Sequence, residues 1–380
     1  MVMRPRSVRS PKARRAGTAV VTALLLATAA CASTATTKPV STSHPETVAI
    51  ATSSSPFVPE MMARASGKVV YVLGTVACPT GVCSRLLRSS DDGSSFEPVS
   101  LPVPGFVVGA VQELRFANPT DGYLLYGQPV NDVLYVTDDS AHSWRAVNFG
   151  SKLSVLSIAT TPQLAYATVS KPSAGRWGSY RLARSVAGSS NWTVVSVARA
   201  ERYSETLVGA AVGERVWLVA GNGTGDVTLS LSVNEGTSFT DIWNGAGLIS
   251  CGPFATSDTV VWLDCSGGTM ADWFRSTDGG RHFRFISALR PYHTAPFDPV
   301  GNTVVFTCLP AGSGADVYRS TNGGETFEVR GKVPVKDVQG ADVSFANRQQ
   351  GLVLVSPLVA PPNELFRTND GGVTWIRVRV

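Results

Sequence analysis

The chain has 380 residues, 43% of them hydrophobic, and its 36 glycines and 23 prolines favour a turn-rich all-β protein with a large core. The formal net charge of +5 originates in the first 30 residues, which hold six of the 33 Lys and Arg residues and none of the 28 Asp and Glu residues. The remaining 27 basic and 28 acidic residues give a net charge of −1, so nothing indicates the basic surface that a nucleic-acid partner requires.

Residues 1–31 have the organisation of an export signal. Basic residues up to Arg15 precede an uncharged stretch, 16–30, that is too short and too rich in Ala and Thr to predict a membrane span. Cys31 follows Thr28-Ala29-Ala30, and this segment resembles the bacterial lipobox, in which the cysteine is acylated and becomes the new N-terminus; the usual Leu is Thr28 here. Ordinary cleavage at the small-residue site Ala30-Cys31-Ala32 is the alternative.

Residues 32–55 are dominated by Ser, Thr, Ala and Pro, with few large apolar side chains to bury. Such a composition predicts a disordered tether. A tether between a membrane anchor and a folded domain, which we expect at 56–380, is suited to display beyond the membrane surface.

A turn motif recurs through the rest of the chain: an aromatic residue with Ser or Thr seven positions before it, Asp or Asn five before it and Gly three before it. The complete copies are Ser89-Asp91-Gly93-Phe96, Ser232-Asn234-Gly236-Phe239, Ser276-Asp278-Gly280-Phe283, Ser320-Asn322-Gly324-Phe327 and Thr368-Asp370-Gly372-Trp375. The degenerate copies are Thr137-Asp139-Ala141-Trp144 and Ser185-Ala187-Ser189-Trp192. We call these seven segments the box turns.

The spacing of the box turns predicts the architecture. Their aromatic residues are separated by 48, 48, 47, 44, 44 and 48 residues, and repeats of that length are typical of four-stranded propeller blades. Apolar runs rich in β-branched and aromatic residues lie between the turns. We therefore predict an all-β, seven-bladed β-propeller of antiparallel blades, each with its box turn between strands C and D. Residues 375–380 would form the last D strand, unless residues 47–52 supply one instead.

The composition of the box turn has a physical explanation. Its polar side chains can hydrogen bond to nearby backbone N–H groups, Gly permits positive φ, and the aromatic ring packs between sheets, contributing about 2 kcal/mol. The motif resembles the Asp-box or BNR repeats of sialidases, sortilin-type receptors, xyloglucan-degrading enzymes and photosystem II assembly-factor-like propellers. In those families the turns lie at the periphery, away from the ligand face. The resemblance implies a structural role for Asp91, Asp139, Asn234, Asp278, Asn322 and Asp370.

The cysteines after Cys31 would lie in a compartment that permits disulfides. Cys78 and Cys83 bracket a short loop, which predicts one bridge. Cys251 and Cys265 fall on adjacent predicted strands, roughly opposite each other, which predicts a second. Cys308 has no obvious partner, and we interpret it as a buried thiol.

No catalytic or metal-binding signature accompanies the repeat. None of the four histidines has the spacing of a zinc site, and the pairs Asp91-Asp92 and Asp138-Asp139 lie in box turns. The Arg-Ile-Pro motif of sialidases is missing, those enzymes resemble six-bladed propellers, and xyloglucan-type hydrolases pair two propellers. We predict a non-enzymatic protein without cofactor or metal. The alternative is an Asp-box glycoside hydrolase, which requires two carboxyl groups about 5–9.5 Å apart.

The predicted binding surface is the face opposite the box turns, formed by the B–C and D–A loops. Arg, Tyr and Trp, which are enriched at interface hot spots, occur there, although these residues could instead cover loop backbone or pack internally. The candidates are Arg176, Trp177, Tyr180, Arg199, Arg202, Tyr203, Trp243, Trp273, Arg290, Tyr292 and His293. We expect a monomeric binding or scaffold protein for a protein or glycan partner. It would be exported to the outer face of the cytoplasmic membrane or to the cell wall, with the N-terminal lipid as its only membrane attachment, and secretion is the alternative.

Overall fold

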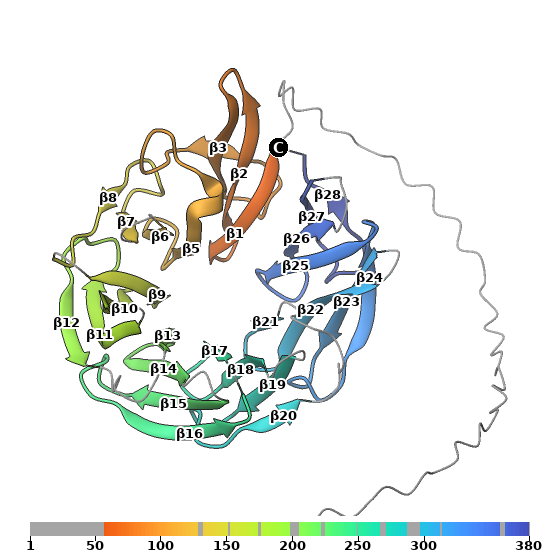
Figure 1. Cartoon of the computed structure of the whole chain (residues 1–380). Helices are drawn as coiled ribbons and strands as arrows, with labels where there is room; N and C mark the ends of the chain where they lie inside the picture. The colour runs from red at the N-terminus through yellow and green to blue at the C-terminus, as the bar shows by residue number, and fades with distance from the viewer. Residues whose placement is uncertain are drawn as a thin grey trace, which may run out of the picture. The chain divides into compact units, whose positions relative to one another are not determined.

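The computed structural model describes residues 57–127, 132–150, 153–173, 176–197, 205–221, 225–248, 250–266, 271–286, 297–311, 314–357 and 362–379. All of them belong to one of the two units into which the chain divides, Ala51–Val380. Within these residues, 28 strands form seven four-stranded antiparallel sheets arranged in a ring (Figure 1). The predicted seven-bladed propeller is confirmed. No helix in the described part of the chain is long and apolar enough to cross a membrane.

Each blade is a run of four consecutive strands. Blades one to three contain β1 (Val58–Ser66), β2 (Val69–Cys78), β3 (Gly81–Ser89), β4 (Glu97–Val99); β5 (Val111–Phe116), β6 (Gly122–Tyr126), β7 (Val133–Thr137), β8 (Arg145–Ala146); and β9 (Ser154–Thr160), β10 (Leu164–Ser173), β11 (Arg176–Val186), β12 (Thr193–Val197). Blades four and five contain β13 (Glu205–Val212), β14 (Arg215–Gly221), β15 (Asp226–Ser232), β16 (Thr240–Ala246); and β17 (Ser250–Ala255), β18 (Val261–Ser266), β19 (Ala271–Ser276), β20 (Arg284–Ile286). Blades six and seven contain β21 (Phe297–Val300), β22 (Val304–Ala311), β23 (Gly314–Ser320), β24 (Glu328–Val333); and β25 (Val338–Phe345), β26 (Gly351–Pro357), β27 (Glu364–Thr368), β28 (Ile376–Arg377). One 3-10 helix, Val108–Ala110, precedes β5.

The ring closes without strand exchange among the described strands. Pairing follows sequence order in every blade, and the first strand of each blade lies nearest the centre of the ring (Figure 1). In the last blade β28 pairs with β27. Side chains join blade seven to blade one instead. Arg64 of β1 donates to the backbone oxygen of Ser344 at 3.0 Å and to its hydroxyl at 2.9 Å. An apolar cluster that includes Met62, Val72 and Leu352 packs between the same two blades.

The box turns have the hydrogen bonds that their composition predicts. In blade five the Ser276 hydroxyl donates to Asp278 Oδ1 at 2.8 Å and accepts the backbone N–H of Gly280 at 2.8 Å, where φ is +94°. Asp278 Oδ1 in turn accepts the backbone N–H groups of Arg281 and His282, both at 3.0 Å. The equivalent serine or threonine and acidic or amide residues make the same contact in blades one, two, four, six and seven.

The aromatic residue of each box turn packs between its own blade and the preceding one. Trp192 of blade three lies against Tyr123 of blade two with ring centroids 5.9 Å apart. Phe283 of blade five contacts Trp243 of blade four at 5.3 Å. The apolar clusters of the protein therefore lie between blades, and each box turn directs a ring into one of them.

Candidate functional site

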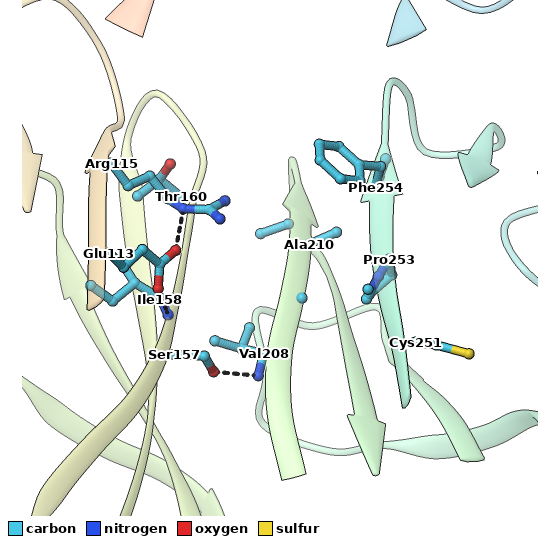
Figure 2. Close-up of a pocket in the computed structure, with 14 residues that line it drawn as sticks. Glu113, Arg115, Ser157, Ile158, Thr160, Val208, Ala210, Cys251, Pro253 and Phe254 are labelled. Carbon is cyan, nitrogen blue, oxygen red and sulfur yellow. Dashed lines mark hydrogen bonds and ion pairs between the residues drawn. The ribbon is translucent and has the colours of Figure 1, made fainter. Parts of the chain in front are cut away.

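A cavity of about 310 Å³ lies among the innermost strands of four blades, β5, β9, β13 and β17 (Figure 2). Its lining is mostly small or apolar, including Ile158, Val208 and Ala210. Two of its lining residues are charged, and both come from β5: Glu113 and Arg115. Because alternate residues of a strand point to the same side, residues two positions apart can form a pair there.

Glu113 holds Arg115 in a fixed position. Glu113 Oε1 accepts from Arg115 Nε at 2.7 Å, while Oε2 accepts the backbone N–H of Ile158, in the next blade, at 3.1 Å. Both carboxylate oxygens are therefore engaged. The Arg115 side chain is 41% exposed, and its Nη1 and Nη2 make no hydrogen bond to any residue that the structure describes. The terminal edge of this guanidinium is available to a ligand.

An aromatic side chain faces Arg115 across the cavity. Phe254, in β17, is 47% exposed, and Figure 2 shows its ring and the Arg115 guanidinium extending toward one another from opposite walls. Beside it, Gly252 leaves open space, because a Cβ placed there would meet only the backbone oxygen of Asp264, at 4.0 Å. The cavity thus combines one positioned cation with an apolar wall.

A second group of charges lies on the innermost strands of blades six, seven and one. Burial raises the pKa of Asp298 to about 7, although its Oδ2 accepts the backbone N–H of Phe345 and the charge of Arg64 lowers that pKa. Burial also raises the pKa of Asp342 to about 6. By residue surface area Asp298 is half-buried and Asp342 is exposed, so the cause is reduced hydration of the carboxyl groups among neighbouring strands rather than complete exclusion of water. The negative charge of Asp342 raises the pKa of Asp298 further.

Two residues predicted for the binding face are part of the core instead. Tyr180 lies within β11 and is fully buried, and Trp273 in β19 is 6% exposed. The prediction was wrong for these two because the strands extend further than expected and buried side chains cannot contact a partner at the surface. Trp243 in β16 is half-buried and packs against Phe274 and Phe283, and its role in binding stays a prediction.

The remaining candidates stay predictions. Arg176 and Trp177 begin β11, but their side chains lie outside the described set. The candidates outside the described residues are Cys31, Arg199, Arg202, Tyr203, Arg290, Tyr292 and His293. The side chain of Cys308, in β22, is also outside it.

Both predicted disulfides are present. Cys78 and Cys83 join the ends of the β2–β3 turn, with Cα atoms 5.8 Å apart, and Cys251 and Cys265 are directly opposite in the β17–β18 pair. In the described part of the chain, no three His, Cys, Asp or Glu side chains come together as a metal site would require.

Five residues of these sites were not predicted from the sequence: Glu113, Arg115, Phe254, Asp298 and Asp342. A signal did exist for the first pair, since a Glu and an Arg two positions apart interrupt an apolar strand. Nothing in the sequence indicates that this strand would meet Phe254, which follows more than a hundred residues later, because the two come together only when the ring forms.

Comparison with known proteins supports the fold alone. No protein-family model matches the chain, and no curated protein matches it in sequence. Among solved structures, puromycin hydrolase is 11% identical with a TM-score of 0.60; the match covers 84% of this chain and 54% of the hydrolase, so the present chain spans about half its length. The β-propeller domain of the Trilobed protease from Pyrococcus furiosus is 9% identical with a TM-score of 0.56, covering 85% and 95%. YCF48 from Cyanidioschyzon merolae is 14% identical with a TM-score of 0.47, covering 70% and 84%.

Proposed function

We propose that this protein is an exported, non-enzymatic propeller that binds a protein or glycan partner through the cavity between blades two and five. The observation that carries the proposal is the arrangement of Arg115, Glu113 and Phe254. Both carboxylate oxygens of Glu113 already accept hydrogen bonds, one from Arg115 and one from a backbone N–H group. The cavity therefore offers a fixed guanidinium and an apolar wall, which suit ligand recognition rather than acid–base chemistry. Arg176 and Trp177 remain candidates for further contacts to the partner.

The proposal includes an extracytoplasmic location. Two disulfides support it, because such bonds persist in oxidising compartments. Residues 1–31 direct export, Cys31 carries the lipid, and residues 32–55 hold the monomeric propeller away from the membrane. Cell fractionation tests this: the Cys31→Ser variant moves from the membrane fraction to the medium. Retention of that variant in the membrane fraction contradicts the anchor.

Site-specific crosslinking on intact cells tests the binding site. A photo-reactive benzoylphenylalanine replaces Phe254 in one variant and Val329, which is 60% exposed on the outer strand β24, in the control. We expect a discrete crosslinked product from position 254 and none from position 329. Adding Gly252→Val, which narrows the cavity, abolishes the product. Equal yields from both positions, or a product insensitive to Gly252→Val, contradict the proposal.

A second candidate, a glycoside hydrolase, is supported by the group around Asp298. Both Asp298 and Asp342 have raised pKa values, and the charges of Asp342 and Arg64 both act on the pKa of Asp298. A carboxyl group that stays protonated near neutral pH can serve as a general acid. This candidate ranks second because Asp298 already accepts a backbone N–H group. The test is release of sugars from a panel of glycans. Release by the wild type that is lost in both Asp298→Asn and Asp342→Asn would favour the hydrolase over the binding protein.

A further inference from the structure

We infer that the cavity between blades two and five recognises a carboxylate joined to an apolar group, as found at the C-terminus of a peptide that ends in an apolar residue. The inference rests on the proposed binding function and names the chemistry of its ligand.

The polar half of the ligand is assigned by Arg115. A guanidinium has five N–H donors in a planar fork, and its terminal edge matches the two oxygens of a carboxylate. Glu113 takes the Nε donor at 2.7 Å and leaves that edge open. Its second oxygen is fixed to Ile158 N, so the pair cannot rotate without losing a backbone hydrogen bond. The arginine is held ready, which reduces the entropy lost on binding.

Charge in the cavity permits an incoming anion. Glu113 is the one acidic residue among those that line it, and its charge is already compensated by Arg115. The pair has no net charge, so a ligand carboxylate is held by the open terminal N–H donors of Arg115 rather than by an excess of positive charge, and the lining presents no second carboxylate.

The apolar half is assigned by the walls. Val208, Ala210 and Pro253 lie along β13 and β17, and the Phe254 ring, 47% exposed, loses water when an apolar group covers it. A volume of about 310 Å³ is at the lower end for ligand cavities and accommodates the last one or two residues of a chain rather than a folded surface. A terminal carboxylate followed by its apolar side chain places both groups within that space.

Calorimetry with the purified, exported protein tests the inference. The probes are an acetylated tetrapeptide ending in Leu with a free carboxylate, the same peptide amidated, and a free-acid version ending in Asp. We expect the first to bind, and the other two to bind at least about tenfold more weakly, since one loses charge-assisted bonds and the other places a charge against Phe254. N-acetyl-leucine is the fourth probe, and affinity equal to that of the tetrapeptide overturns the peptide assignment in favour of a small acid.

Variants locate the effect. Arg115→Gln weakens binding of the free-acid peptide at least about tenfold, and Arg115→Lys, which keeps the charge but not the fork, gives an intermediate loss. Arg284→Gln is the matched control, because Arg284 is also ion-paired, to Glu325, but lies on the outer strand β20. It leaves affinity unchanged. Thermal unfolding shows whether each variant is folded.

The outcomes separate this inference from the proposed function. If the crosslinker at position 254 captures a partner on cells, and adding Arg115→Gln does not reduce the yield, the carboxylate assignment is wrong and the proposed binding function is retained. If neither crosslinking nor calorimetry detects a ligand, both fall. Equal affinity for the acid and amide peptides also overturns the carboxylate assignment.

Discussion

Carboxylates in the box turns and carboxylates on the innermost strands have opposite properties. Burial disfavours the charged form of Asp139, but hydrogen bonds from the Ser143 hydroxyl, the Ser143 backbone N–H and Thr137 outweigh it and lower its pKa to about 2. Asp298 receives one backbone N–H group, and burial raises its pKa to about 7. Deep burial with one donor raises the pKa of Asp298, whereas several donors at a more peripheral position lower the pKa of Asp139.

This contrast distinguishes the repeated box turns from the charged residues of the innermost strands, which do not repeat. The box turn supplies the same donors in blade after blade, so its acids are charged parts of the fold. The charged residues of the innermost strands differ from blade to blade, and the positioned Arg115 and the raised pKa values both occur among them. Features that could bind or react are therefore found in the part of the chain that the repeat does not determine.

Arg64 connects an innermost strand to a box turn. Among the variants considered, its replacement should cause the largest loss in the free energy of unfolding. Its Nη1 contacts Asp92, in the first box turn, at 2.7 Å, and the Asp92 side chain is only 2% exposed. Arg64→Met leaves that carboxylate buried without its cation and also removes the bonds to Ser344 that close the ring. We expect a loss of about 3–5 kcal/mol in the free energy of unfolding, measured by urea denaturation.

The matched control is an exposed pair. Arg284 and Glu325 are 2.9 Å apart, with both side chains about half exposed, and Arg284→Met should cost at most about 1 kcal/mol. Similar losses in the two variants would mean that the Arg64 contact is no more important than a surface ion pair. The double variant Arg64→Met, Asp92→Asn should recover part of the loss, since it removes the buried charge.

The box turn itself is tested by Ser276→Ala. The Ser276 hydroxyl is buried and accepts the backbone N–H of Gly280 at 2.8 Å, which the variant leaves without a partner, so we expect a loss of about 1–3 kcal/mol. Ser185→Ala in the degenerate turn is the comparison. That hydroxyl donates to the backbone oxygen of Asn191 at 2.7 Å, so its removal leaves no backbone N–H group without an acceptor. Urea denaturation of both variants gives the difference, and equal losses contradict the proposed role of the complete motif.

The fold could be predicted from sequence because the box turn is local. Its hydroxyl, acid, glycine and aromatic residue act within eight positions, so the pattern is visible in each copy, as in Ser276 to Phe283, and the spacing gives the blade count. The disulfides were also accessible, since Cys78 and Cys83 are five residues apart. Local hydrogen bonds and short loops leave a signal that survives without any tertiary information.

The site could not be predicted in the same way. Trp273 was assigned to a loop because tryptophan beside polar residues is typical of both an interface and a core, and only the length of β19 distinguishes them. Arg115 and Phe254 belong to blades that are brought together by ring closure. The surroundings of Asp298 likewise depend on Phe345, in the next blade.

The pH dependence of Asp298 gives a smaller effect with a definite sign. Its folded pKa of about 7 exceeds the ordinary value of 3.8, so the folded state keeps a proton that the unfolded state has lost, and its contribution to stability decreases as pH rises from about 4 to 7. Asp298→Asn removes that dependence and can still accept from Phe345. In thermal unfolding across this range, the melting temperature of the variant should rise relative to that of the wild type as pH rises. A constant difference between them contradicts the raised pKa.

Asp139→Asn should show the smallest change, with the opposite dependence. Its folded pKa of about 2 lies below 3.8, so the charged form stabilises the folded state above about pH 4, and that contribution is lost as pH falls toward 2. Asparagine can hold the turn, because Asn234 and Asn322 occupy the same place in blades four and six and accept the same backbone N–H group. The variant should therefore melt slightly below the wild type at pH 7, and this difference should shrink as pH falls through 3 toward 2. If it instead gained on the wild type as pH rose, as Asp298→Asn is expected to do, the division between box-turn and inner-strand carboxylates would fail, because the two regions would then respond to protonation in the same direction.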